Sequence, residues 1–311
     1  HRTRFLTLGL VCPTPVKISE YMGLNMIFRV LGYGLLAPLL VVANACNVFA
    51  ADNDNFESLF NGHDLSGWDT WLGPEEIPTM PTRLWTEFPP AVGLNTDPTS
   101  VYSVVTVDDA PAIRISGEIW GALVSQQTFS NYHLRLEYKW GTEKHGASKN
   151  KPPNAGVLYH SVGEIGGFWN CWMSSAEFEI MYGNTGDFLS LDGVMGRIAT
   201  TWEFKTSFPW HRYTPGAELT DASGMAFWVG ASQDTERPIG EWNQVELYVF
   251  EDKAIQIVNG VEVLRVTDLR YEKDGEAVPL REGKLQLQSE GAEVYYRNIE
   301  WRPIAALPVE H

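Results

Sequence analysis

From residue 56 onward, apolar and polar residues alternate in short segments that are separated by Gly, Pro, Asn and Asp. An alternation with a period of two is typical of β-strands that have one buried face and one solvated face. The clearest example is His-Leu-Arg-Leu-Glu-Tyr-Lys-Trp at 133–140, with its apolar residues on one side. No long amphipathic helix stands out, so the pattern predicts an antiparallel all-β sandwich or barrel.

The predicted strands share this alternation and have turn-forming residues at their ends. They are 101–107, 112–116, 121–126, 133–140, 155–161, 176–182, 243–251, 284–289 and 293–301, with a hairpin at 254–266 around Asn259-Gly260. Asn-Gly favours a hairpin because it tolerates the positive φ angles of a type I′ turn. About a dozen strands in about 250 residues exceed the roughly seven of an immunoglobulin-type sandwich and fit one large jelly-roll sandwich. The segments 73–100 and 141–153 are predicted as long loops, which often carry function.

Residues 1–50 are predicted to be an upstream extension and a signal peptide rather than part of the domain. Arg29 precedes an apolar run, and small residues favour cleavage near Ala50. The run is interrupted by Pro38 and is too short for a confident membrane span. A lipid-modified Cys46 is the alternative, but the preceding Ala-Asn-Ala matches a lipoprotein signal poorly. We therefore expect a secreted or periplasmic domain at 51–311, without a transmembrane helix.

The charge of the chain disfavours nucleic acid as a partner. The formal net charge is -16, and the predicted mature chain lacks four of the bases and one of the acids, which makes it more acidic still. Such a chain repels phosphate backbones, whereas a neutral sugar is unaffected. Of the three cysteines only Cys171 lies after residue 50, so no internal disulfide is expected and Cys171 is interpreted as a small buried residue.

Two carboxylates stand two positions apart in Ser-Ser-Ala-Glu-Phe-Glu-Ile-Met-Tyr-Gly at 174–183. On a strand, Glu177 and Glu179 point to the same side and begin about 6.6 Å apart at the backbone. Acids this close repel, which raises one pKa above the other and separates an acid from a base. Their spacing alone is more typical of a solvated strand face. Trp169 and Trp172 favour the functional interpretation, because flat aromatic rings beside carboxylates suit a sugar site.

The sequence contains few other residues or motifs that indicate a particular catalytic or binding chemistry. His160 follows Leu158 on a predicted strand face, where a lone His is more often a hydrogen-bonded structural group than a base. No His-x-x-x-His, Cys-x-x-Cys or calcium-loop pattern is present, so a metal site would have to be assembled from distant strands. The absence of a Gly-x-Ser-x-Gly turn and of a phosphate-binding loop argues against esterase and kinase activity and against a nucleotide or organic cofactor.

Six short segments together resemble one family. They are Leu59-Phe-Asn-Gly-His-Asp-Leu-Ser-Gly-Trp68, Asn154-Ala-Gly-Val157, Glu177-Phe-Glu-Ile180, Gly240-Glu-Trp-Asn243, Leu287-Gln-Ser-Glu-Gly291 and Arg297-Asn-Ile299. In this order they resemble motifs of the 3-keto-disaccharide hydrolase family, long catalogued as a domain of unknown function. The matches extend over essentially the whole predicted mature chain.

This resemblance implies a concanavalin A-like jelly roll, a single domain that acts on glycosides already oxidised to a ketone at C3. A C3 ketone acidifies the C2 proton, so a base can remove it and expel the glycosidic oxygen from C1, with hydration completing net hydrolysis. Such a site needs a base, a proton donor for the leaving oxygen and an electrophile for the ketone. A divalent cation could be that electrophile, as members of the family suggest.

The resemblance also assigns site residues. Glu177 occupies the position of a family glutamate and is predicted to be the base or a metal ligand, whereas Glu179 replaces the usual Gln and is predicted to bind a substrate hydroxyl. Glu137 matches a family acid and would cooperate with His160 as proton donor or metal ligand. The remaining predicted substrate-binding residues are Asn154, Trp169, Trp172, Asp187, Gln288, Glu290 and Arg297, of which Asn154, Gln288, Glu290 and Arg297 are expected to line the concave face. For Asn154 and Arg297, hydrogen bonding within the sandwich is the alternative.

Two other functions are compatible with the same residues. A non-catalytic carbohydrate-binding module would use the aromatic residues alone, because jelly-roll sandwiches also bind sugars without turnover. An ordinary glycosidase would act on unoxidised glycan through Glu177 and Glu179, whose expected separation lies nearer the inverting range of about 6.5–9.5 Å. The family's usual Gln at position 179 counts against the second alternative.

Overall fold

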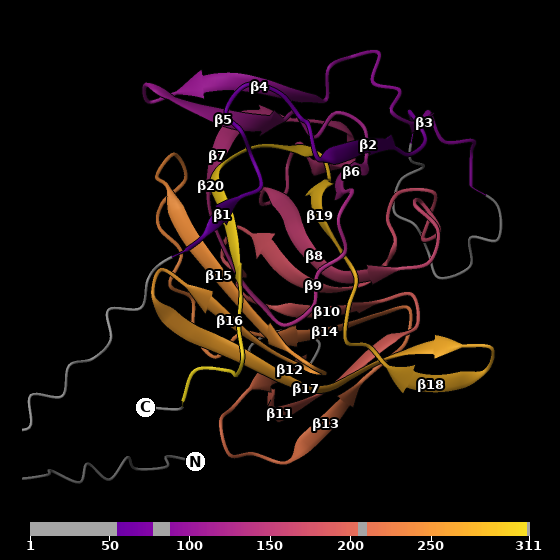
Figure 1. Ribbon diagram of the computed structural model, residues 1–311, viewed down its shortest axis with the longest axis vertical. Helices are drawn as coiled ribbons and strands as arrows, with labels where there is room; N and C mark the ends of the chain where they lie inside the picture. Colours follow the sequence, from indigo (N-terminus) through magenta and orange to yellow (C-terminus); the bar gives the residue numbers. More distant parts are fainter. Residues whose placement is uncertain (1–54, 77–87, 205–209, 310–311) are drawn as a thin grey trace, which may run out of the picture. The chain divides into compact units, whose positions relative to one another are not determined.

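The computed structural model describes residues 55–76, 88–204 and 210–309 (Figure 1). The predicted signal peptide at 1–50 and part of the predicted loop at 73–100 lie outside these ranges. Within them the chain is built from strands, with one 3-10 turn at Gly146–Ser148 and no α-helix. Among the described residues no helix is long and apolar enough to cross a membrane.

The first sheet is antiparallel, and its long strands come from distant parts of the sequence. Its order is β4 (Tyr102–Val107), β5 (Ala110–Ile115), β20 (Ala292–Pro303), β7 (Tyr132–Lys144), β15 (Asn243–Phe250), β16 (Lys253–Val258) and β17 (Val261–Lys273), with β1 (Glu57–Ser58) paired to the end of β20.

The second sheet packs against the first and carries the candidate site. Its order is β3 (Gly93–Leu94), β2 (Trp68–Leu72), β6 (Gly121–Ser125), β19 (Lys284–Ser289), β8 (Asn154–Val162), β9 (Ser174–Met181), β10 (Phe188–Leu191), β14 (Ala226–Gly230) and β12 (Trp210–Tyr213). All neighbours are antiparallel except the pair β12 and β14.

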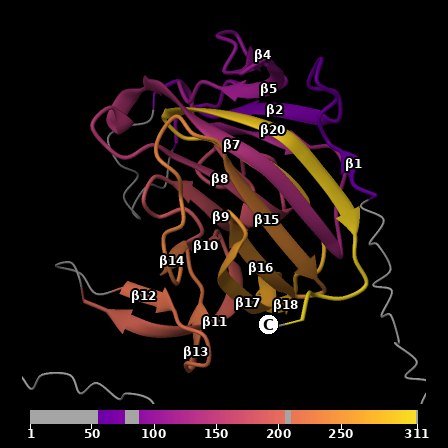
Figure 2. The ribbon, with the colours of Figure 1, turned by 90° about the vertical axis from the view of Figure 1, so that its left-hand side faces the viewer.

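One strand joins the two sheets at an edge. β11 (Val194–Glu203) pairs with β12 of the second sheet, with β13 (Leu219–Ala222) and with β17 of the first sheet, and β18 (Glu276–Pro279) extends β17. Figures 1 and 2 show β7, β15 and β16 in one layer beside β8, β9 and β10 in the other. The predicted fold class, a jelly-roll sandwich of two antiparallel sheets, is confirmed.

The main hydrophobic core lies between the sheets. Leu134, Leu136 and Tyr138 of β7 enter it from the first sheet, and Phe178 and Ile180 of β9 enter it from the second. Each such side chain contributes roughly 1.5–3 kcal/mol when it leaves water. A smaller cluster covers the opposite face of the second sheet and includes Leu158, Phe168, Cys171, Trp172 and Met173. Cys171 is a buried free thiol, as predicted.

The alternation located most of the strands but not all of them. Every predicted strand is present, with ends shifted by a few residues, and the segment 254–266 forms the hairpin of β16 and β17. The strands from 188 to 230 were missed because most of them are only four or five residues long and do not alternate cleanly. The predicted loop at 141–153 begins instead as the continuation of β7 to Lys144.

Candidate functional site

Two glutamates of β9 lie on the face of the second sheet that points away from the main core. Because Phe178 enters the core, its neighbours Glu177 and Glu179 point to the other side. Glu177 pairs in register with Leu158 of β8, and Glu179 pairs with Gly156. Both carboxyl side chains belong to residues that are only 2% exposed. The interpretation as an exposed, solvated strand face is therefore wrong.

A glycine makes room for these side chains. A Cβ atom at Gly156 would lie 2.3 Å from Oε1 of Glu177 and 3.1 Å from Oε1 of Gln288. Those distances are shorter than van der Waals contact, so an alanine there would force the carboxylate to move. Gly156 thus brings together Glu177 from β9 and Gln288 from β19.

Four buried oxygen atoms on this face have no hydrogen-bond partner among the described residues. They are Oε1 of Glu177, Oε1 of Glu179, Oε1 of Gln288 and Oδ1 of Asn154. Buried polar atoms are normally paired, and each unpaired one costs roughly 1–3 kcal/mol. Such oxygens are suited to accept hydrogen bonds from substrate hydroxyls or to bind a hard cation.

Burial raises the pKa of three carboxyls on this face. The pKa of Glu177 is raised well above its usual value by burial and then by the charge of Glu290. The pKa of Glu179 is raised by burial and then by the charge of Glu177. Burial also raises the pKa of Glu290, to about 8, although the Lys151 ammonium and a hydrogen bond from Asn154 oppose the shift. Of the three carboxyls, Glu290 is the one beside a cation.

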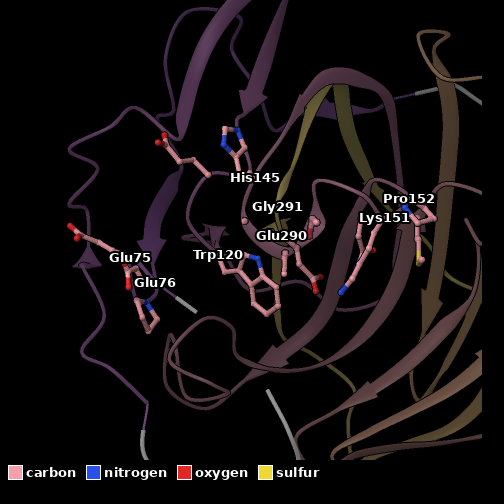
Figure 3. Close-up of a pocket in the computed structure, with 16 residues that line it drawn as sticks. Glu75, Glu76, Trp120, His145, Lys151, Pro152, Glu290 and Gly291 are labelled. Carbon is pink, nitrogen blue, oxygen red and sulfur yellow. The ribbon is translucent and has the colours of Figure 1, made fainter. Parts of the chain in front are cut away.

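A pocket of about 360 Å³ opens at the end of the second sheet (Figure 3). Figure 3 shows the Glu290 carboxylate between the indole of Trp120 and the side chain of Lys151. The other side chains with polar or charged groups in its wall are Glu75, Glu76, Glu118, His145, Ser148 and Asn154. An aromatic ring beside a carboxyl, an amide and a cation is an arrangement that suits a sugar.

The glutamate pair lies behind this pocket rather than in its wall. Met181 at the end of β9 lines the pocket, and Glu179 and Glu177 follow two and four residues further into the sheet. Neither glutamate is a lining residue. The structure therefore brings together the predicted residues Glu177, Glu179, Asn154, Gln288 and Glu290, of which Asn154 and Glu290 reach the pocket directly.

The two predicted tryptophans cover the same face. Trp172 is 2% exposed, donates a hydrogen bond from Nε1 to the Gly121 carbonyl at 2.8 Å, and stacks on Trp120 at 5.4 Å. Trp169 is half-buried and stacks on Phe168 at 4.3 Å. Trp120, which the sequence analysis did not single out, is the aromatic residue that lines the pocket.

Glu137 and Arg297 lie on the outer face of the first sheet, away from the second sheet. The neighbours of Glu137 along β7 point into the core, so Glu137 points outward. Arg297 pairs with it across β20 and β7 and donates from Nε to its Oε2 at 2.5 Å. Arg297 also lies 3.8 Å above the ring of Trp242. The expectation that Arg297 lines the concave face is therefore wrong, and its alternative, bonding within the sandwich, is what the structure has.

His160 lies inside the sandwich, at an irregularity of β8. Its φ angle of 50° and the register shift between Tyr159 and Val162 disturb the alternation at this point. The fully buried ring packs edge-on against Tyr132 at 6.0 Å, and burial lowers the pKa of His160 to about 4. Since Tyr132 points into the core and Glu137 points outward from the same strand, the predicted pairing of Glu137 with His160 is not formed.

Asp187 is a buried anchor between neighbouring segments. Its Oδ2 accepts a hydrogen bond from Nε1 of Trp228 at 2.6 Å, and its Oδ1 accepts one from the amide of Ala231 at 2.6 Å. Burial raises the pKa of Asp187 to about 6. Both carboxylate oxygens are engaged within the protein, so the structure gives its predicted contact with substrate no support.

Most residues of the pocket wall were not predicted from the sequence, among them Trp120, His145 and Lys151. Trp120 lies directly before β6 and two residues after Glu118, whereas His145 and Lys151 lie in the segment 141–153, whose predicted length was the one available signal. Nε2 of His145 is buried and has no hydrogen-bond partner among the described residues.

The donor set on the sheet suits a hard cation. Carboxylate and amide oxygens are the ligands that Ca²⁺ and Mg²⁺ prefer, and the unpaired oxygens of Glu177, Glu179, Gln288 and Asn154 are of this kind. Within the described ranges, no group of three or more His, Cys, Asp or Glu side chains is placed to hold a metal ion. A cation here would therefore depend on the amide oxygens as well as the two carboxylates.

Comparison with known proteins gives one family and several distant structures. The sequence pattern of the 3-keto-alpha-glucoside-1,2-lyase-like domain matches residues 55–302. A search of curated protein sequences found no match. Among solved structures, a provisionally assigned glycosyl hydrolase from Parabacteroides distasonis superimposes with a TM-score of 0.46 and 16% identity, over 80% of this chain and 94% of that chain.

Two further structures are more distant. A β-glucanase from Bacillus licheniformis has a TM-score of 0.38 and 9% identity, over 79% of this chain and 96% of that chain. A carbohydrate-binding module from Bacillus subtilis has a TM-score of 0.37 and 8% identity, over 64% of this chain and 89% of that chain.

Proposed function

Because the chain belongs to the 3-keto-alpha-glucoside-1,2-lyase-like family and is therefore a carbohydrate-active enzyme, we propose that it cleaves the glycosidic bond of glycosides that carry a ketone at C3. The ketone acidifies the proton on C2, so a carboxylate can remove it. The C1–O bond then breaks by elimination, and hydration of the unsaturated sugar completes net hydrolysis. The apolar run before Ala50 supports the accompanying proposal that the enzyme acts after export.

The observation that carries this proposal is the pocket at the end of the second sheet, which has one half-buried carboxyl group in its wall and two buried ones behind the wall. Glu290 and Asn154 lie in the wall, and Glu177 and Glu179 lie directly behind it. Elimination needs groups that transfer protons, and burial has raised the pKa of Glu290 to about 8 and the pKa of Glu177 and Glu179 well above their usual value. Each of these buried acids opposes folding when it ionises, a cost that proton transfer in catalysis would account for.

A divalent cation fits the same proposal. When bound, it would polarise the C3 ketone as a Lewis acid. Glu177, Glu179, Gln288 and Asn154 would hold it, since their unpaired oxygens are the donors available. These residues would otherwise position the substrate through its hydroxyls.

The test is to mix the purified chain from residue 51 onward with a disaccharide and with its 3-keto derivative, with and without a chelator. Release of free monosaccharide from the keto sugar alone is expected, and its loss on chelation would assign a metal to the reaction. Release from the unoxidised disaccharide would instead indicate an ordinary glycosidase. Binding without release from either sugar would contradict the proposal and favour a carbohydrate-binding module.

A further inference from the structure

The proposed elimination requires one group that reaches C2 of a sugar in the pocket. Four carboxyls line the wall, and three of them, Glu75, Glu76 and Glu118, are exposed at the rim. Glu290 alone is half-buried, and it directly follows β19, which pairs with β6 and β8 inside the second sheet. A catalytic group is held most accurately when a rigid element carries it.

The surroundings of Glu290 suit a group that acts on a bound sugar. Its carboxylate lies in the pocket wall between the indole of Trp120 and the side chain of Lys151 (Figure 3). Asn154, which also lines the pocket, donates a hydrogen bond to it. Glu177 and Glu179 are not lining residues and lie further into the sheet.

Resting on the proposed function, we infer that Glu290 is the catalytic base that removes the C2 proton, with Lys151 facing the enolate that forms. The C2–H electron pair first forms the C2–C3 double bond of the enolate, and the C3 oxygen takes the negative charge. The enolate then collapses: the C3 ketone is restored, the pair forms the C1–C2 double bond, and the C1–O bond breaks. The leaving oxygen takes a proton from water, and the protonated Glu290 returns its proton to the resulting hydroxide. This assignment replaces Glu177 as the base and leaves the glutamate pair with a positioning role.

The experiment compares wild type, Glu290→Gln and Glu290→Asp on 3-keto-glucosides deuterated at C2. One substrate carries a sugar as leaving group and the other carries 4-nitrophenol, which leaves without protonation. Cleavage and release of deuterium into water are both followed. A good leaving group can compensate for a missing proton donor but not for a missing base, so the two substrates separate these roles.

The expected result is that Glu290→Gln loses about 10²–10⁴-fold in rate on both substrates and releases no deuterium. Glu290→Asp should recover part of the rate, because it restores a carboxylate at the same place. If Glu290→Gln still cleaves the 4-nitrophenyl substrate, or keeps both activities, the assignment is wrong. If wild type cleaves neither keto sugar, the proposed function fails instead.

The melting temperature of each variant, measured by circular dichroism, shows whether it is folded. If a folded Glu290→Asp recovers no rate over Glu290→Gln on either substrate, the assignment is wrong. Glu276→Gln on β18 is the matched control, since Glu276 is exposed and lies outside the pocket; its rates should equal those of wild type.

Discussion

Buried glutamates set the chemical character of the candidate site. Glu177, Glu179 and Glu290 occupy one sheet face, and burial is the largest cause of the raised pKa of each. A carboxyl with a raised pKa in the folded state stabilises the fold only while it is protonated. Its contribution is complete below the unfolded pKa near 4.5 and is lost as pH rises through the folded pKa.

Replacing Glu179 by Gln should therefore reduce the dependence of stability on pH. In wild type we expect the free energy of unfolding to fall between pH 5 and pH 8, by up to about 1.4 kcal/mol per pH unit for each such group. Glu179→Gln removes one titrating group, so the free energy of unfolding of this variant should fall less steeply with pH. Urea unfolding at four pH values measures both slopes. Equal slopes would show that Glu179 is already ionised in the folded protein.

At the scale of the element, strand β8 determines which side chains of the candidate site lie next to one another. Its residue Gly156 lies between Glu179 of β9 and Gln288 of β19, and the missing Cβ leaves the space that the Glu177 carboxylate occupies. Further along the strand, the irregularity at His160 interrupts the alternation and directs the ring into the core. A single strand therefore contributes to the site at one end and to the core at the other.

Gly156→Ala should impair activity more than folding. The added methyl group would meet a carboxylate at the flexible end of a side chain, so the carboxylate can move while the sheet stays paired. We expect at least a tenfold loss of kcat on a 3-keto-disaccharide, and a loss of stability of about 1–3 kcal/mol. Gly230→Ala is the matched control, because a Cβ there would meet no atom closer than 3.5 Å. If the two variants have equal kcat, the position of Glu177 does not matter for turnover.

At the scale of the molecule, one unit contains both the core and the site. The unit extends over Asn53–His311, and its main core joins side chains from both sheets. The first sheet carries ion pairs such as Arg297 with Glu137 on its outer face, whereas the second sheet carries the unpaired carboxylate oxygens of Glu177 and Glu179. The sandwich therefore separates a structural face, whose charges are paired, from a face that has groups left for a ligand.

Removal of residues 1–52 should leave the unit intact. We expect an unchanged melting temperature by circular dichroism and unchanged kcat/KM on the 3-keto-disaccharide, because the unit has its own core. A chain that starts at residue 66 is the comparison, since it also loses β1 and the buried Phe60 and should melt at a lower temperature. A decrease of more than about 5 °C for the first truncation would mean that residues before 53 stabilise the domain.

The amino-acid sequence alone determined the features that depend on neighbouring residues. The alternation of apolar and polar side chains depends only on neighbouring residues. It was therefore sufficient to predict the strands at 133–140 and 176–182, and to predict that Glu177 and Glu179 point to the same side. The ordered motifs gave the family, which the match over residues 55–302 confirms.

Only the tertiary structure decided which of these side chains meet. Strand pairing is non-local, so the sequence did not place Glu137 and Arg297 on the opposite sheet from Glu177, nor Lys151 beside Glu290. A one-residue irregularity turned His160 into the core, and no short pattern encodes such a shift. Burial by strands and loops from distant parts of the chain then raised the pKa of the glutamates, because desolvation depends on everything that surrounds a charge.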